Sequence, residues 1–451
     1  MNHLQELARF VARLSAQDVP DEAWEAAKRS VLDTVSAAVG GAGTDQALHI
    51  RNTYLDLYGS QGRSAVWGCG EARSGPVAAF LNAMNGHILE LDDVHTRSKV
   101  HIGTVVIPAA WAAAQALDRS GREFLLAAVC GYETAARVGM GFGVASHRSR
   151  GWHATSTAGI FGAAAACAKL MRLSEEQTLS ALGIAGTQAF GTWAFLEDRA
   201  GNKILHPARA ASSGYESACL SEAGMTGAAH ILDATDGGLY AAMSDAGDCS
   251  RVSRGLGTCW EIIRMDTKPY PCCRSTHCAI DGALALRNRF GVSADEIEHI
   301  QISTYLVGYQ QCGHSAGSLC PATFIDAKFS TPYVVACALL RGGVTVQDFA
   351  PAAIADPAAQ DLLRRVTVRP EDCFTQAYPL QWGCALTARL KDGKVRRVEV
   401  QDASGSEKNS LGTKQLMDKS LSLLTPCFGA EAPALADKIL CMDTLPFLPF
   451  F

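Results

Sequence analysis

The chain changes its sequence pattern near residue 266, and this change limits the possible fold more than any other feature. Before it, apolar residues recur every three or four positions in segment after segment, which predicts a succession of α-helices. One such stripe begins at Trp24 and is expected to end at Gly40-Gly41. Another covers 157–170 and is rich in alanine and glycine, so its backbone is expected to pack closely against neighbouring helices.

After residue 266, apolar and polar residues alternate, which predicts strands. Two alternating runs flank Asp392-Gly393, a dipeptide typical of a β-hairpin turn. Helices are expected over 279–289 and 329–340, and the pattern is helical again after about 403. We therefore expect a mainly α protein in which a smaller α+β lid domain is inserted into a large all-helical domain formed by both chain ends. The predicted boundaries are 1–265 for the helical domain, 266–402 for the lid and 403–451 for the C-terminal return.

Composition excludes several classes of protein. A formal net charge of −5 without a basic run argues against nucleic-acid binding. No uncharged apolar run approaches the roughly 20 residues of a membrane span, and the N-terminus resembles no signal or transit peptide. The 16 cysteines lie largely within apolar runs, as reduced cysteines of cytoplasmic proteins do. Cys272-Cys273 and Cys278 lack zinc-site spacing, so no metal is predicted.

Two segments combine cations, imidazoles and carboxylates. In Lys268-Pro-Tyr-Pro-Cys-Cys-Arg274-Ser-Thr-His, the prolines keep the backbone extended ahead of a helix, which suits a carboxylate site but also an ordinary strand-to-helix connection. The loop that carries Asp92, Asp93 and His101 leads into a buried helix. It is either a solvated charged loop or a site whose histidine is held neutral at a helix start.

Three further segments add candidate residues. His153 follows a tryptophan ahead of a small-residue helix and is either a satisfied core histidine or a base. Lys203 flanks an apolar run, and Tyr333 belongs to a segment that is alternatively an ordinary helix N-terminus capped by Ser330. No nucleotide, phosphate or metalloprotease motif occurs, so no cofactor is predicted. Such a set of cations and imidazoles suits proton removal α to a carboxylate of a small di- or tricarboxylate; the alternative of another class is a non-catalytic carboxylate-binding protein.

The chain resembles the MmgE/PrpD family, which includes 2-methylcitrate dehydratase, cis-aconitate decarboxylase and iminodisuccinate epimerase. The resemblance rests on Leu32-Asp33-Thr-Val, the Asp92-Asp93 loop, Gly151-Trp-His153, Ala181-Leu-Gly-Ile-Ala-Gly, Lys203-Ile-Leu-His206, Lys268-Pro-Tyr-Pro and Phe329-Ser330-Thr-Pro-Tyr333. It implies a homodimer with a cofactor-free site between a helical domain and a lid. It also implies catalytic residues at His101, His153, Lys203 and Lys268, with Asp92, Asp93 and Tyr333 as substrate-binding residues. Arg274 is a further candidate for binding a substrate carboxylate, because its guanidinium presents a fork of N–H donors.

Departures from the family pattern bear on the reaction. Decarboxylases of the family keep a threonine where this chain has Val94, an aspartate where it has Glu90 and an imidazole where it has Cys273. Valine cannot donate a hydrogen bond to a substrate. By elimination, the sequence favours an isomerase, an epimerase of the iminodisuccinate type; the alternatives are lyases with 2-methylcitrate dehydratase or cis-aconitate decarboxylase activity.

Overall fold

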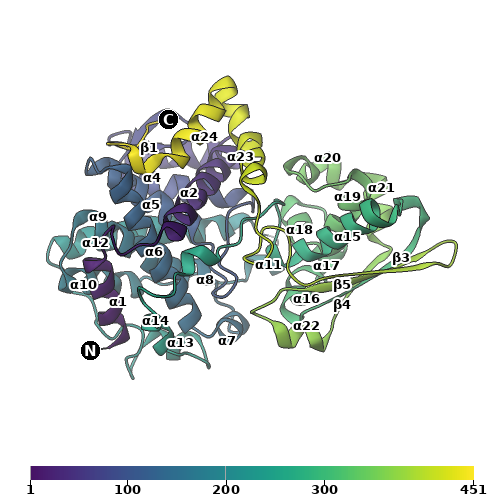
Figure 1. Cartoon of the computed structure of the whole chain (residues 1–451), viewed down its shortest axis with the longest axis horizontal. Helices are drawn as coiled ribbons and strands as arrows, with labels where there is room; N and C mark the ends of the chain where they lie inside the picture. The colour runs from purple at the N-terminus through teal and green to yellow at the C-terminus, as the bar shows by residue number, and fades with distance from the viewer. Residues whose placement is uncertain (1, 199) are drawn as a thin grey trace. The chain divides into compact units, whose positions relative to one another are not determined.

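In the computed structural model, which describes residues 2–198 and 200–451, the chain separates into two units (Figure 1). The helical unit comprises Met1–Trp193, Asn202–Thr267 and Gly412–Phe451. The mixed unit comprises Ala194–Gly201 and Lys268–Leu411. The chain is mainly helical, with small sheets. Among the described residues, no helix combines the length and the apolar character that crossing a membrane requires.

Helix α9 (Gly159–Met171) is the centre of the helical unit, and α5, α6, α10 and α12 pack around it. Its small residues permit this packing: a Cβ atom at Gly162 would lie only 2.7 Å from the carbonyl oxygen of Gly131 on α6. The predicted close packing of this segment is confirmed. The helices of the unit are α1 (His3–Arg13), α2 (Asp21–Ala42), α3 (Asp45–Tyr58), α4 (Gly75–Ile88), α5 (Gly103–Ala116), α6 (Gly121–Gly141), α7 (Val144–Ser149), α8 (Ala154–Thr157), α9, α10 (Glu175–Gly186), α12 (Leu205–Glu222), α13 (Leu239–Met243), α14 (Ser250–Ser253), α23 (Thr413–Phe428) and α24 (Ala432–Leu440).

Two details of the helical unit differ from the prediction. Helix α2 continues through Gly40-Gly41. A Cβ at Gly41 would lie 2.0 Å from the carbonyl oxygen of Asn85, so the glycine permits close contact with α4 and does not end α2. The unit is also not entirely helical. Strands β1 (Ser64–Val66) and β2 (Glu71–Arg73) form an antiparallel ribbon whose turn contains two glycines with positive φ.

Helices from the last part of the sequence pack against α2. Helices α23 and α24, yellow in Figure 1, lie against α2. The ammonium of Lys419 on α23 lies 2.5 Å from Oδ1 of Asp33 on α2 and 2.7 Å from the carbonyl oxygen of Leu91. The side chains of Lys419 and Asp33 are 7% and 1% exposed, so this is a buried ion pair.

The mixed unit is built on a sheet with strand order β4-β3-β5-β6, in which β3 pairs parallel with β4 and antiparallel with β5. The predicted hairpin at Asp392-Gly393 joins β5 to β6, with Gly393 at φ +84°. Helix α15 packs on β5 through Gly282, where a Cβ would lie 2.5 Å from Leu386. The strands are β3 (Ile297–Thr304), β4 (Val366–Pro370), β5 (Cys384–Leu390) and β6 (Val395–Val400). The helices are α11 (Phe195–Asp198), α15 (His277–Phe290), α16 (Leu306–Cys312), α17 (Ala316–Leu319), α18 (Phe324–Lys328), α19 (Thr331–Arg341), α20 (Pro351–Ile354), α21 (Pro357–Leu363) and α22 (Asp372–Ala377).

Candidate active site

The charged loop after α4 is buried, not solvated. Helix α4 ends at Ile88, and Glu90 then adopts φ +56°, a left-handed conformation that is uncommon for residues other than glycine. This turn directs the following residues into the helical unit, where Asp92 and Asp93 are at most 1% exposed. The Lys419 ammonium donates to the carbonyl of Leu91, the residue directly ahead of Asp92. The first part of the loop is therefore held by helix α23.

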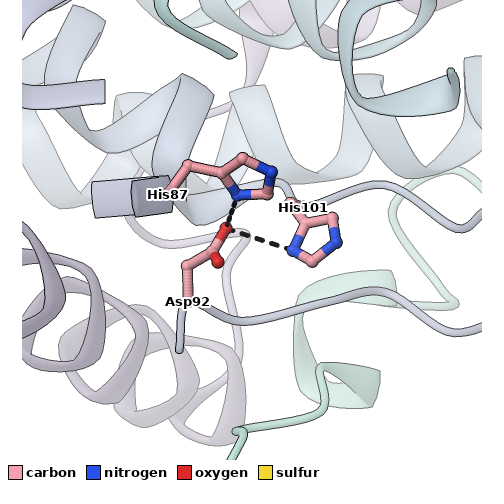
Figure 2. A group of neighbouring side chains, drawn as sticks. All are labelled: His87, Asp92 and His101. Atoms are coloured by element: carbon pink, nitrogen blue, oxygen red, sulfur yellow. Dashed lines mark hydrogen bonds and ion pairs between the residues drawn. The ribbon is translucent and has the colours of Figure 1, made fainter. Parts of the chain in front are cut away.

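Asp92 lies between two imidazoles (Figure 2). Its Oδ2 atom is 2.8 Å from Nδ1 of His87, in the last turn of α4, and 3.1 Å from Nδ1 of His101, just ahead of α5. Burial alone would raise the pKa of Asp92, but the two imidazoles outweigh it and hold the pKa well below its ordinary value. Asp92 is therefore a buried carboxylate whose negative charge is shared by two histidines.

A buried ion pair adjoins this group. Lys203 belongs to a short 3-10 turn ahead of α12, and its ammonium contacts Oε1 of Glu90. The same Oε1 atom lies 3.6 Å from Nε2 of His87. The side chains of Lys203 and Glu90 are 8% and 7% exposed. The candidate catalytic lysine is thus paired with a carboxylate from the same loop that carries Asp92.

His153 belongs to a second imidazole pair. Its Nδ1 atom lies 2.8 Å from Nδ1 of His206 on α12, so one nitrogen donates and the other accepts. Its ring is 6.4 Å from that of His87 and meets the edge of Trp193 at 4.9 Å. Burial lowers the pKa of His153 well below its ordinary value, and burial with the nearby cationic groups lowers that of His206 to about 4. Both imidazoles are neutral at pH 7.

Asp93 does not contact His101. Its Oδ1 accepts from the backbone N–H of Gly103, and its Oδ2 accepts from the hydroxyl of Tyr132, each at 2.8 Å. Burial, together with the charge of Asp33, raises the pKa of Asp93 to about 8. Asp93 therefore holds the start of α5, while the carboxylate of Asp92 contacts the imidazole of His101.

The remaining candidate residues belong to the mixed unit. Lys268 is fully buried. Arg274 donates to the Ser404 carbonyl and contacts Nδ1 of His277, both at 2.9 Å. Tyr333 is also fully buried, and its hydroxyl donates to the Asp348 and Ala353 carbonyls. These contacts favour a structural role for Arg274 and Tyr333. The roles of Lys268, Arg274 and Tyr333 toward substrate stay predictions.

Sequence reasoning missed His87, His206 and Glu90 as site residues. His87 lies within an apolar helical run, where a histidine reads as part of the core. His206 enters the sequence argument only as a neighbour of Lys203. Its position three residues after a candidate lysine is the signal that could have identified it. Glu90 was noticed only as a departure from the family pattern.

The triad of His87, Asp92 and His101 also has the composition of a metal site. Two imidazole nitrogens and one carboxylate oxygen suit a first-row transition metal, and the ligand atoms all lie within 4.8 Å of one another. The same Asp92 oxygen makes a hydrogen bond with Nδ1 of His87 and lies at ion-pair distance from Nδ1 of His101. The triad can therefore serve as an acid–base group without a metal.

Comparison with known proteins places the chain. The MmgE/PrpD N-terminal domain matches residues 5–251, and the MmgE/PrpD C-terminal domain matches residues 270–443. A cis-aconitate decarboxylase-like protein of Aspergillus oryzae is 29% identical, over 87% of this chain and 85% of its own length. The human cis-aconitate decarboxylase is 29% identical over 98% and 90%, and that of Aspergillus terreus is 26% identical over 91% and 86%.

These relatives are enzymes named as decarboxylases, so they support the lyase alternative of the sequence analysis and give no support to the epimerase that it favoured. Matches of both domains, which together span most of the sequence, show that the chain belongs to the MmgE/PrpD family.

Proposed function

We propose that this protein is a lyase that removes CO2 from a small unsaturated tricarboxylate such as cis-aconitate. The observation that carries the proposal is the buried group of two imidazole pairs around the Lys203–Glu90 ion pair, in a chain similar to cis-aconitate decarboxylases over most of its length. Imidazoles and a lysine are the groups that such a reaction needs, because its substrate is a polyanion and its intermediate must be protonated.

The chemistry divides between these groups. When the C–C bond to the leaving carboxylate breaks, its electron pair stays on carbon and spreads over the adjacent double bond. Positive charge close to the resulting anion stabilises it, which is the role we assign to Lys203. Lys268, which belongs to the other unit, keeps the role that the family resemblance implies. A proton must then be added at carbon. His101 is the acid that we assign, since the Asp92 carboxylate favours its protonated form, and the neutral His153 acts as a hydrogen-bonding group to substrate.

Val94 bears on which acid is the substrate. Its backbone pairs with that of Asp266 at 3.0 and 2.9 Å, and its side chain is 2% exposed. The nearby hydroxyl of Thr96 does not replace the threonine of family decarboxylases, because it donates to the Asp266 carboxylate at 2.7 Å. We therefore expect this protein to bind its substrate without the hydrogen bond that the threonine hydroxyl offers in those decarboxylases.

The test is incubation of the protein with a panel of di- and tricarboxylates in D2O, with cis-aconitate labelled by ¹³C in its carboxylates. Release of labelled CO2 together with one deuterium in the product supports the lyase. Deuterium in recovered substrate without CO2 release indicates the epimerase. Loss of water from a hydroxy acid, or addition of water to cis-aconitate, without CO2 release indicates a dehydratase. Saturable binding without turnover of any acid indicates a carboxylate-binding protein.

A matched pair of variants connects the activity to this site. His101→Gln should lower kcat by about 100-fold or more, as expected for loss of a general acid. His230→Gln replaces an exposed histidine that pairs with Asp233 and should leave the rate unchanged. Equal rates for the two variants would show that the chemistry does not use His101.

A further inference from the structure

Two imidazole nitrogens and one carboxylate oxygen come together inside the helical unit (Figure 2). Oδ2 of Asp92 lies 2.8 Å from Nδ1 of His87 and 3.1 Å from Nδ1 of His101, and one ligand atom of each residue lies within 4.8 Å of the others. Three ligands of one zinc ion, each at about 2.1 Å in a tetrahedral arrangement, are separated by about 3.4 Å. Shifts of roughly one ångström or less in these side chains therefore bring the three atoms into coordinating positions.

Glu90 lies at the other ring nitrogen of His87, where it supports metal binding through Nδ1. Its Oε1 atom is 3.6 Å from Nε2 of His87. A histidine that binds a metal usually donates its second ring N–H to a carboxylate or a carbonyl, and this contact fixes the tautomer. A proton held on Nε2 beside Glu90 leaves the lone pair of Nδ1 for an ion. Glu90 also pairs with the Lys203 ammonium, so it weakens the repulsion between that ammonium and a bound metal ion.

The three side chains are held in place by the fold. His87 is in the last turn of α4, and His101 lies just ahead of α5. Asp92 belongs to the loop between these helices, whose Leu91 carbonyl accepts from the Lys419 ammonium. The side chains of His87 and Asp92 are 0% exposed and that of His101 is 11% exposed, so an ion reaches the group from the His101 side. Ligands positioned in this way lose little conformational freedom when an ion binds.

We propose that His87, Asp92 and His101 form a reversible binding site for Zn²⁺, and that the bound ion inhibits the enzyme. The inhibition, but not the binding, rests on the proposed function. The ion takes one lone pair from each Nδ1 atom and one from the carboxylate, and any proton on those nitrogens passes to water. A water molecule completes the four-coordinate site, the composition found in metallopeptidases that hold zinc with two histidines and a carboxylate. The bound ion withdraws His101 from proton transfer and thereby stops decarboxylation.

The binding test is a titration of the full-length protein with Co²⁺ after treatment with a chelator. Co²⁺ absorbs visible light strongly when its coordination is tetrahedral and weakly as the hydrated ion, so it reports entry into such a site. Exposed cysteines, such as Cys259 and Cys427, are alkylated first because thiolates also bind these ions. We expect the absorption to saturate at about one ion per chain and to disappear when Zn²⁺ displaces Co²⁺.

Variants locate the ion. His87→Gln and Asp92→Asn keep the approximate size of their side chains and remove a ligand nitrogen and the ligand charge, respectively. Each should weaken Zn²⁺ binding by about 100-fold or more, since loss of a group that only supports a metal ligand already costs about 10–100-fold. His230→Gln removes an exposed imidazole that pairs with the carboxylate of Asp233, and it should leave the affinity unchanged. Unchanged affinity in both His87→Gln and Asp92→Asn would overturn the site.

Diffraction from zinc-soaked crystals of the parent protein decides the location of the ion if either variant does not fold. An anomalous peak within about 2.3 Å of Nδ1 of His87, Nδ1 of His101 and the Asp92 carboxylate supports the site. A peak elsewhere with none at the triad overturns it.

Inhibition is measured as CO2 release in zinc-buffered solutions at one fixed pH. The rate should fall to half at the free Zn²⁺ concentration that half-fills the site, and excess chelator should restore it. Full turnover with the site filled, or a rate that rises on zinc binding, would overturn the inhibitory role. Zinc binding at the triad of a protein that decarboxylates no acid would refute the proposed function and leave the metal site standing.

Discussion

Replacing Lys419 by methionine should destabilise the helical unit. The substitution keeps the length of the side chain and removes the charge that pairs with Asp33 on α2, while Asp33 stays buried with a side chain 1% exposed. Breaking a buried ion pair by removing one partner costs about 3–5 kcal/mol, because an uncompensated charge is left behind. The Leu91 carbonyl also loses its bond to the ammonium, so we expect the upper part of that range.

The assay is urea unfolding followed by tryptophan fluorescence, since six of the seven tryptophans belong to the helical unit. Lys414→Met, on the same helix at an exposed position, is the control and should change the unfolding free energy by less than about 0.5 kcal/mol. The double variant Lys419→Met/Asp33→Asn should regain at least about 1 kcal/mol, because both charges are then absent. A loss below about 1 kcal/mol in Lys419→Met, or no recovery in the double variant, would refute the reasoning.

Three further outcomes follow from the site. The pKa of Asp93 in the folded protein is raised to about 8, so its contribution to stability is complete below its unfolded pKa of about 4 and is lost as pH rises through 8. The unfolding free energy should therefore fall between these pH values by up to about 1.4 kcal/mol per pH unit. Urea titrations at successive pH values measure this slope, and Asp93→Asn should flatten it. Lys203→Met and Lys268→Met should each lower kcat/KM by a factor that corresponds to about 2–4 kcal/mol of lost transition-state stabilisation, whereas Lys414→Met should not change it. Near-normal rates in either variant would exclude the role assigned to that lysine. A chelator should leave the rate unchanged and added Zn²⁺ should inhibit through the triad, whereas loss of activity on chelation that Zn²⁺ restores would show a metal-dependent reaction.

Local signals explain which parts of the fold could be predicted. Ser330 caps α19 and the hairpin turn occurs at Asp392-Gly393, because each depends on a few residues adjacent in sequence. The continuation of α2 through Gly41 could not be predicted in this way. A helix-ending glycine and a packing glycine look alike until the partner, here the backbone of Asn85, is known.

The site divides in the same manner. His101 and His153 could be predicted because each stands ahead of a helix in a segment with unusual polar groups, and Lys203 because it flanks an apolar run. His87 and Asp92 are five residues apart, a separation that does not place two side chains on the same face of a helix. Their contact forms where α4 has ended and Glu90 turns the backbone, so the helical pattern could not predict it. Likewise, Asp92 and Asp93 are neighbours in sequence, yet their carboxylates bind separate partners.

The ion pair between α2 and α23 also has a consequence for how the protein is made. Asp33 emerges from the ribosome almost 400 residues before Lys419, its partner. Until that last stretch is synthesised, neither Asp33 nor the Leu91 carbonyl has its contact with the Lys419 ammonium. The nascent chain must therefore complete the whole mixed unit before the Asp92-Asp93 loop gains this contact, although every candidate catalytic residue has by then been translated.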